Sequence, residues 1–187
     1  QINRELTQRE LLPGGPYAGL PAFYSPLFHY MAAIIGSLAP IELTGANLGL
    51  LSLAYLLADT VSNLIWGYVG DRTGFRLVML VSIVVWIAAT LLLLNVDTFW
   101  PIFAAFFGLG AAQSGYMMSA GTMVLEFGER DELPMRVAFS STAEGIMASA
   151  GPLLGGVIAT TLGYGALFWT SIGFLTVGFL LFLLLVR

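Results

Sequence analysis

The sequence predicts an all-α membrane protein, a bundle of six transmembrane helices. Of its 187 residues, 58 % are hydrophobic and only 10 % are charged, whereas an ordinary soluble domain is about 25 % charged. The few charged residues gather in short stretches between long apolar runs. A chain with so little polar surface is expected to use the lipid bilayer as its solvent, and each run is near the roughly 20 residues that cross hydrocarbon.

The chain begins with a polar segment, residues 1–16, which we expect to be a cytoplasmic lead-in. The six-helix bundle then occupies residues 17–187. Its first span, about residues 17–38, contains Pro21 and Pro26. This helix must be kinked, because each proline removes one backbone hydrogen bond.

Turn-forming or charged residues separate the five later spans. Thr44 is a suitable N-cap for the second span, and Gly163 interrupts the apolar run between the last two. The expected ranges are about 45–67, 76–95, 99–125, 135–160 and 165–186.

Composition also excludes several kinds of function. Without cysteine there is no disulfide, thiolate metal site or cysteine catalysis. Without lysine there is no phosphate-binding G-x-x-x-x-G-K-[ST] loop, and a single histidine excludes a multi-histidine metal site. The net charge of −4 argues against nucleic acid as a partner. No paired acid and base suggest an enzyme, so we expect no catalysis, metal or cofactor.

The arginines predict the orientation in the membrane. With six spans, the N-terminus, the turn at 67–76, the loop around 126–135 and the C-terminus share one side. These segments carry all seven positive charges of the chain. The positive-inside rule places that side in the cytoplasm, and we expect an integral protein of a bacterial inner membrane with both termini cytoplasmic.

Residues 67–76, Gly-Tyr-Val-Gly-Asp-Arg-Thr-Gly-Phe-Arg, form a polar hairpin between two apolar spans. Its glycines permit a tight turn and close helix approach. Its carboxylate can accept bonds from a helix start, and its guanidinium groups can pair with that carboxylate or with lipid phosphate. On these grounds alone the hairpin is an anchored loop with a surface charge cluster. The residues concerned are Gly67, Gly70, Asp71, Arg72, Gly74 and Arg76.

The spacing G-x-x-x-D-R-x-G-x-R, placed between the second and third spans, resembles the signature loop of the major facilitator superfamily. The family often has a further basic residue where this chain has Val78. In that family the loop packs on a helix of the opposite half and helps to hold the cytoplasmic side shut. The resemblance therefore implies a conformational latch made by Asp71, Arg72 and Arg76.

A second motif lies in the fifth span and is similar to the antiporter-associated motif of the same family. Its glycines offer a flat face to a neighbouring helix, and its proline opens the backbone. Ordinary tight packing and a hinge that bends during transport both account for it, and it does not prove antiport. The motif residues are Gly151, Pro152, Gly155 and Gly156.

Members of this family normally have twelve helices in two halves, so the resemblance implies that this chain is one half. Trp66-Gly67 and Leu125-Glu126 look more like the C-terminal half, which makes residues 1–16 the end of the central linker. The N-terminal half is the alternative. The other half belongs to the same polypeptide, to a separate chain or to a second copy.

In the family, the substrate lies near the membrane midplane. At a rise of 1.5 Å per residue, several polar residues here fall at or near that depth. Ionisable residues inside a membrane are costly and usually mark pathways. We expect at least one of the two carboxyl groups to carry a proton or contact substrate, whereas the histidine and the amides are equally consistent with hydrogen bonds between helices. The candidates are His29, Asp59, Asn63, Gln113 and Glu144.

The expected function is therefore secondary transport of a small solute by alternating access, with proton coupling as a further hypothesis. The expected partners are the lipid bilayer, the other six-helix half and a small-molecule substrate. The alternative is a non-transporting membrane scaffold, assembly factor or structural subunit on the same fold.

Overall fold

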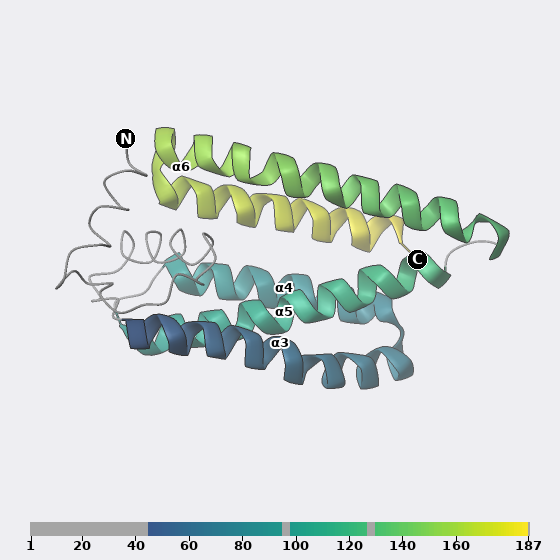
Figure 1. Ribbon diagram of the computed structural model, residues 1–187, viewed down its shortest axis with the longest axis horizontal. Coiled ribbons are helices and arrows are strands. Elements are labelled where there is room, and N and C mark those ends of the chain that lie inside the picture. Colours follow the sequence, from purple (N-terminus) through teal and green to yellow (C-terminus); the bar gives the residue numbers. More distant parts are fainter. Residues whose placement is uncertain (1–44, 95–97, 127–129, 187) are drawn as a thin grey trace.

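A computed structural model (Figure 1) describes residues 45–94, 98–126 and 130–186. The polar lead-in 1–16, the first expected span 17–38 and His29 lie outside the described residues. The described part is helical without any strand, which confirms the all-α class. The count of six spans stays a prediction, because the first of them is not described.

The helices of the described part are α3 (Gly45–Thr73), α4 (Phe75–Leu94), α5 (Phe99–Glu126), the short 3₁₀ helix η1 (Arg130–Glu132) and α6 (Leu133–Leu185). Of these, α3, α4 and α6 are long and apolar enough to cross a membrane, judged by length and composition. Helices α3 and α5 run in the same direction, and α4 runs in the opposite direction on the other side of α5 from α3 (Figure 1).

Helix α6 consists of two antiparallel arms that lie side by side (Figure 1). The chain reverses at Gly163, whose φ of 85° and ψ of 168° are not helical. Side chains disfavour this conformation, so glycine is suited to it. The arms touch where Gly155 faces Leu167, whose Cδ1 lies 3.6 Å from the position of a Cβ on Gly155. The break therefore lies at Gly163, whereas Pro152 stays inside the first arm.

The polar stretch 67–76 is mostly helical, which differs from the hairpin loop suggested by the sequence. Helix α3 continues past residue 67 to Thr73, and α4 begins at Phe75. Only Gly74 lies between them, with a positive φ of 87°. Its N–H donates to the carbonyl oxygen of Gly70 at 2.8 Å, which closes the last turn of α3. One glycine in a left-handed conformation is thus enough to reverse the chain.

Gly70 makes room for the aromatic ring of Phe75. A Cβ at residue 70 would lie only 2.5 Å from Cε1 and 2.7 Å from Cζ of that ring. By contrast, the nearest atoms to a Cβ at Gly67 belong to Met118, at 3.9 Å, which is an ordinary contact. Of the two glycines predicted to allow close approach, Gly70 therefore has a packing role in the turn, whereas Gly67 makes only an ordinary contact.

Helix α5 is the central helix of the described bundle, because it packs against both α3 and α4. Leu51 and Ala54 of α3 form a buried cluster with Ile102 and Phe106 of α5. Small and polar side chains are common along the rest of α5, among them the fully buried Ser119. These residues lower the hydropathy of α5 in the middle of the helix.

Two glycines of α5 permit its close contact with its neighbours. A Cβ at Gly110 would overlap the carbonyl oxygen of Tyr55 and lie 2.9 Å from its carbonyl carbon. A Cβ at Gly115 would overlap the hydroxyl of Ser82 and lie 2.9 Å from Nε1 of Trp66. Helices α3 and α4 thus approach α5 most closely at these two glycines.

Candidate functional site

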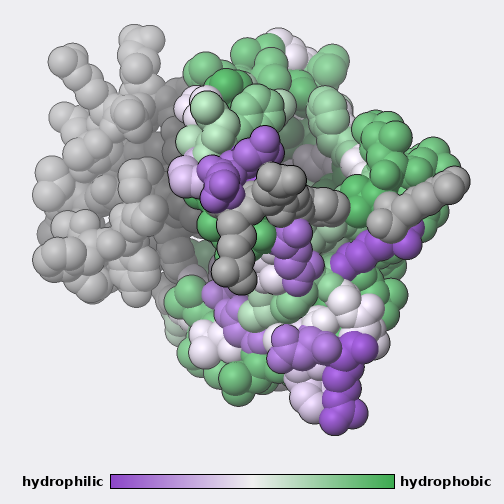
Figure 2. All heavy atoms as spheres, turned by 90° about the vertical axis from the view of Figure 1, so that its right-hand side faces the viewer, coloured by the Kyte–Doolittle hydropathy of each residue, from purple (hydrophilic) through white to green (hydrophobic). Residues whose placement is uncertain are grey.

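The charged residues of the described part gather at one end of the bundle. This is the end at which α3 turns into α4, and Figure 2 shows hydrophilic residues clustered on it. Two carboxyl groups are exceptions, because Asp59 and Glu144 lie within helices, away from that end. The charged residues at the polar end are Asp71, Arg72, Arg76, Glu126, Arg130, Asp131, Glu132 and Arg136.

Helix α3 carries a polar face on an otherwise apolar surface. Ser52, Asp59 and Asn63 are spaced seven and four residues apart, which places them on one side of a helix. Ser52 and Asp59 are half-buried, and Asn63 is exposed. The amide of Asn63 donates to the backbone carbonyl oxygen of Asp59 at 3.0 Å, which fixes the amide one turn from the carboxyl group.

Gln113 lies on α5 at a depth similar to that of Asp59. The two helices run in the same direction, and they approach most closely where Gly110 meets Tyr55. About one helical turn beyond this crossing, α3 carries Asp59 and α5 carries Gln113. Gln113 is half-buried and shares a face with Met117, which is 55 % exposed. The described helices therefore leave this face of α5 partly uncovered.

The structure does not bring Glu144 to the polar face of α3. Glu144 is exposed on the first arm of α6, and the hydroxyl of Ser140 donates to its Oε1 at 3.4 Å. Helix α6 packs mainly against α4, and its first arm lies on the far side of the second arm from α3 (Figure 1). The two intramembrane carboxyl groups are thus separate features within the described bundle.

The two arginines of the signature stretch have different partners. The guanidinium of Arg72 lies over the ring of Tyr68, with Cζ 4.3 Å from the ring centroid. Nη2 of Arg76 donates to the carbonyl oxygen of Leu183 near the end of α6, at 3.2 Å. Asp71 is exposed beside them. Arg76 therefore joins α4 to α6 within this chain, whereas Asp71 and Arg72 face outward at the polar end.

The glycines of the second motif have little around them in the described bundle. Gly151 and Gly156 have nothing within 4 Å of a Cβ position, and only Gly155 contacts the other arm of α6. Pro152 and its neighbours Leu153 and Leu154 are exposed. The flat face expected from the sequence is thus present and uncovered by the described helices.

Sequence reasoning missed the contact between Trp66 and α5. Its indole N–H donates to the carbonyl oxygen of Ala111 at 2.8 Å, and the ring passes over Gly115. A tryptophan near the polar end of a span is usually assigned to the membrane interface. The glycines at 108, 110 and 115 on one helix were the signal that another helix approaches α5 closely.

The sequence matches the family model of the Major Facilitator Superfamily over residues 19–187. The chain belongs to this superfamily. This confirms the resemblance found in the signature stretch, and it identifies the chain as part of an integral membrane protein from a family of transporters.

Named relatives support the same assignment. Citrate exporter 1 of Aspergillus niger is 27 % identical over 80 % of this chain and 29 % of its own length. Multidrug resistance protein D of Escherichia coli is 36 % identical over 57 % of this chain and 27 % of its own length. Protein spinster homolog 1 of Xenopus tropicalis is 27 % identical over 75 % of this chain and 28 % of its own length. The chain thus matches less than a third of each relative, and no solved structure matches it.

Proposed function

We propose that this superfamily chain is the C-terminal six-helix half of a secondary transporter that moves a small solute by alternating access. The rest of the transporter comes from the same polypeptide, from a separate chain or from a second copy. The short match to each relative supports a half. So does the first arm of α6, whose large apolar side chains, such as Phe139 and Leu153, are exposed and fit a neighbouring helix or lipid.

The observation that carries this proposal is the position of Asp59. A half-buried carboxyl group inside a helix that is apolar enough to span a membrane is costly. Asn63 lies one turn away on the same face, and Gln113 lies at a similar depth on the neighbouring helix. A scaffold gains nothing from these groups, whereas a solute path needs a few polar groups among apolar walls.

The charges of this region favour a neutral or cationic solute. Asp59 is acidic, and the arginines of the described part lie at helix ends or in η1. A tricarboxylate such as citrate would meet a like charge at Asp59, with no arginine of the described helices near it. The proposed solute class is therefore closer to that suggested by the name of the bacterial multidrug relative than to that of the fungal citrate exporter.

We further propose that the polar end is cytoplasmic and that Asp71 and Arg72 act as one side of a latch against the opposite half. Both lie at the exposed end of α3, where a second half can reach them. Arg76 supports the latch from behind, because its bond to Leu183 ties the start of α4 to the end of α6.

The test is transport by the complete protein in proteoliposomes, with a panel of cationic and neutral drug-like compounds and with citrate as the anionic comparison. Asp59→Asn keeps the shape of the side chain and removes its charge. Loss of a charge-assisted contact with solute predicts about a tenfold or larger fall in kcat/KM for cations. Asp131→Asn in η1 makes the same chemical change at an exposed site and is expected to leave transport unchanged.

The same experiment addresses the scaffold alternative. A correctly folded complete protein that moves none of these compounds in either direction would favour a scaffold. Transport that is equally reduced by Asp59→Asn and Asp131→Asn would remove Asp59 from the proposed path.

A further inference from the structure

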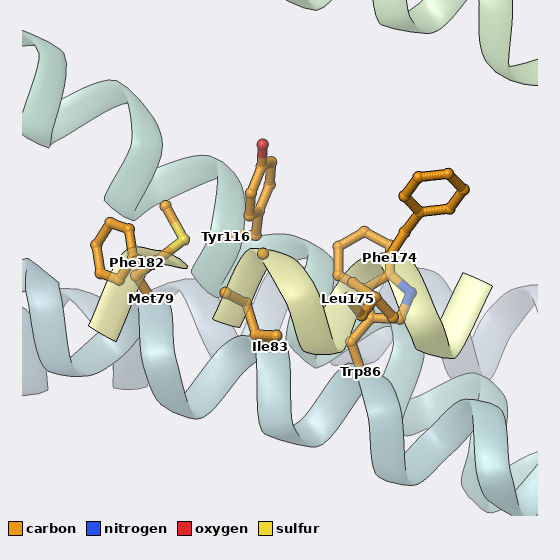
Figure 3. A pocket seen from close by; sticks show the side chains of 8 residues that line it. Met79, Ile83, Trp86, Tyr116, Phe174, Leu175 and Phe182 are labelled. Carbon is orange, nitrogen blue, oxygen red and sulfur yellow. The ribbon is translucent and has the colours of Figure 1, made fainter. Parts of the chain in front are cut away.

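A pocket of about 510 Å³ lies between α4, α5 and the second arm of α6 (Figure 3). Its volume falls within the roughly 300–1,000 Å³ of small-molecule sites. None of the residues that line it carries a charge. Aromatic rings dominate the walls, among them Trp86, Tyr116, Phe174 and Phe182. The pocket is separate from Asp59 and Asn63, which lie on α3.

One face of α4 joins this pocket to the polar end of the bundle. Met79, Ile83 and Trp86 line the pocket, and Arg76 precedes Met79 by three residues. Spacings of three, four and three residues place all four side chains on the same face of a helix. The face therefore begins with a positive charge and continues into an apolar wall.

A contact between Arg76 and α6 shows at which end of the pocket Arg76 lies. Its Nη2 donates to the carbonyl oxygen of Leu183 at 3.2 Å, and the preceding residue, Phe182, lines the pocket. Figure 3 shows Phe182 beside Met79 at this end, with Trp86 and Phe174 farther along. Arg76 is exposed, and a guanidinium has five N–H donors, so donors remain for a further partner.

We propose that this pocket holds an acyl chain of an anionic membrane phospholipid whose phosphate binds Arg76. Arginine matches phosphate oxygens with its planar donors. The site lies between candidate spanning helices, α4 and α6, and its Met79 and Phe182 end faces the charged end of the bundle, where Arg76 lies. Basic pockets between transmembrane helices at the membrane surface are suited to anionic lipid headgroups. The order of charge, then apolar wall, follows the order of phosphate, then chain, in a phospholipid.

Other occupants fit the lining less well. A polar solute would find only two polar groups in the lining, the indole N–H of Trp86 and the hydroxyl of Tyr116, and that hydroxyl points away from α4 (Figure 3). A lipophilic cation would gain contact with the aromatic rings, but it would meet the positive charge of Arg76 at one end and no carboxylate in the lining, because Asp59 is on α3. The acyl chain requires only apolar contact, which Met79, Ile83 and Phe182 supply.

The experiment compares two glycines of the same arm of α6 in the complete protein. Gly178 lines the pocket, whereas Gly173 does not, and neither has an atom within 4 Å of a Cβ position. Gly178→Leu fills the pocket, and Gly173→Leu is the matched control. After detergent washing, phosphatidylglycerol and phosphatidylcholine retained from a one-to-one mixture are measured by mass spectrometry. We expect the unsubstituted protein to retain phosphatidylglycerol preferentially, with about tenfold less in Gly178→Leu and no loss in Gly173→Leu.

Arg76→Gln tests the headgroup contact. It is expected to remove the preference for phosphatidylglycerol while leaving some phosphatidylcholine bound. Glycerol phosphate, which has no acyl chain, is expected not to compete. Competition by glycerol phosphate would instead indicate a site for a free phosphate and would overturn the acyl-chain assignment.

A second measurement does not depend on the folding of the glycine variants. Phosphatidylglycerol brominated on its acyl chain should quench the fluorescence of Trp86. The fraction of tryptophan fluorescence that this lipid quenches should therefore be smaller in Trp86→Phe. Equal retention of lipid by Gly178→Leu and Gly173→Leu, or quenching unaffected by Trp86→Phe, would overturn the proposal. The site does not depend on the proposed transport, so failure of either proposal leaves the other standing.

Discussion

The indole N–H of Trp66 on α3 donates a hydrogen bond to the carbonyl oxygen of Ala111 on α5, across 2.8 Å. Gly115 lies one turn beyond Ala111, and its missing side chain leaves space for the indole. The hydrogen bond therefore depends on the glycine. Together with the crossing of Tyr55 and Gly110, it fixes the register of α3 against α5, which sets the relative depth of the polar groups on the two helices.

The crossing at Gly110 predicts a large effect from a single methyl group. A Cβ there would overlap backbone atoms of Tyr55, which cannot move as a side chain can. Gly110→Ala is expected to destabilise the protein by about 1–3 kcal/mol, the usual range for overpacking. Gly121→Ala on the same helix has nothing within 4 Å and should stabilise by about 0.5–1 kcal/mol through helix propensity. Thermal unfolding in detergent measures both, and equal melting temperatures would contradict the proposed crossing.

The sequence predicted the fold class because composition and spacing are enough for it. Apolar runs longer than 18 residues indicate transmembrane helices, and the spacing of Gly67, Asp71, Arg72, Gly74 and Arg76 identified the superfamily. The ends of the helices were harder to predict from the sequence. Gly163 was predicted to interrupt the chain, but the continuation of α3 to Thr73 was not, because a charged stretch between two spans resembles a loop.

The candidate site was predictable only as a set of polar residues. Asp59 and Gln113 could be assigned a similar depth by counting residues, but the sequence does not say which helices touch. The pairing of α3 with α5, and the distance of Glu144 from that pair, depend on tertiary packing. The partner of Arg76 is remote in sequence at Leu183, which no local pattern indicates.

The turn at Gly74 gives the second stability prediction. Its φ of 87° lies in the left-handed region, which costs other residues roughly 1–2 kcal/mol. Gly74→Ala should lower the free energy of unfolding by about that amount. Gly49→Ala is the control, because it lies within α3 with nothing within 4 Å. A chemical denaturation series of both variants checks this, and a loss confined to Gly49→Ala would contradict the turn geometry.

The latch predicts a change in conformational balance without a change in stability. Asp71 is exposed, so Asp71→Asn should leave the melting temperature within a few degrees of its original value. It should weaken the state closed toward the cytoplasm and lower transport. The chain has no native cysteine, so a single cysteine placed at Leu125, which is 58 % exposed near the polar end, can report access. We expect faster labelling from the cytoplasmic side in the variant.

Arg76→Gln separates the latch from its support. It removes the bond to Leu183 within this chain, so it should reduce stability by up to about 1 kcal/mol, as for exposed hydrogen bonds. Normal transport and unchanged labelling in Asp71→Asn would contradict a latch made by Asp71, whatever the result for Arg76.

Proton coupling can be tested at the two carboxyl groups inside the helices. Asp59 and Glu144 lie on separate elements, α3 and α6. The experiment therefore uses the single variants Asp59→Asn and Glu144→Gln and the double variant that combines them. If one of the two carboxyl groups carries the coupled proton, its neutralisation should abolish the pH dependence of transport measured in proteoliposomes with an imposed pH gradient. Neutralisation of the other should lower the rate at most and leave the shape of the pH profile unchanged.

Asp131→Asn, at an exposed position in η1, serves as the control for a general effect of surface charge. A pH profile that survives the double substitution would exclude both residues as the proton carrier, and a gradient that never drives uptake would indicate transport without proton coupling.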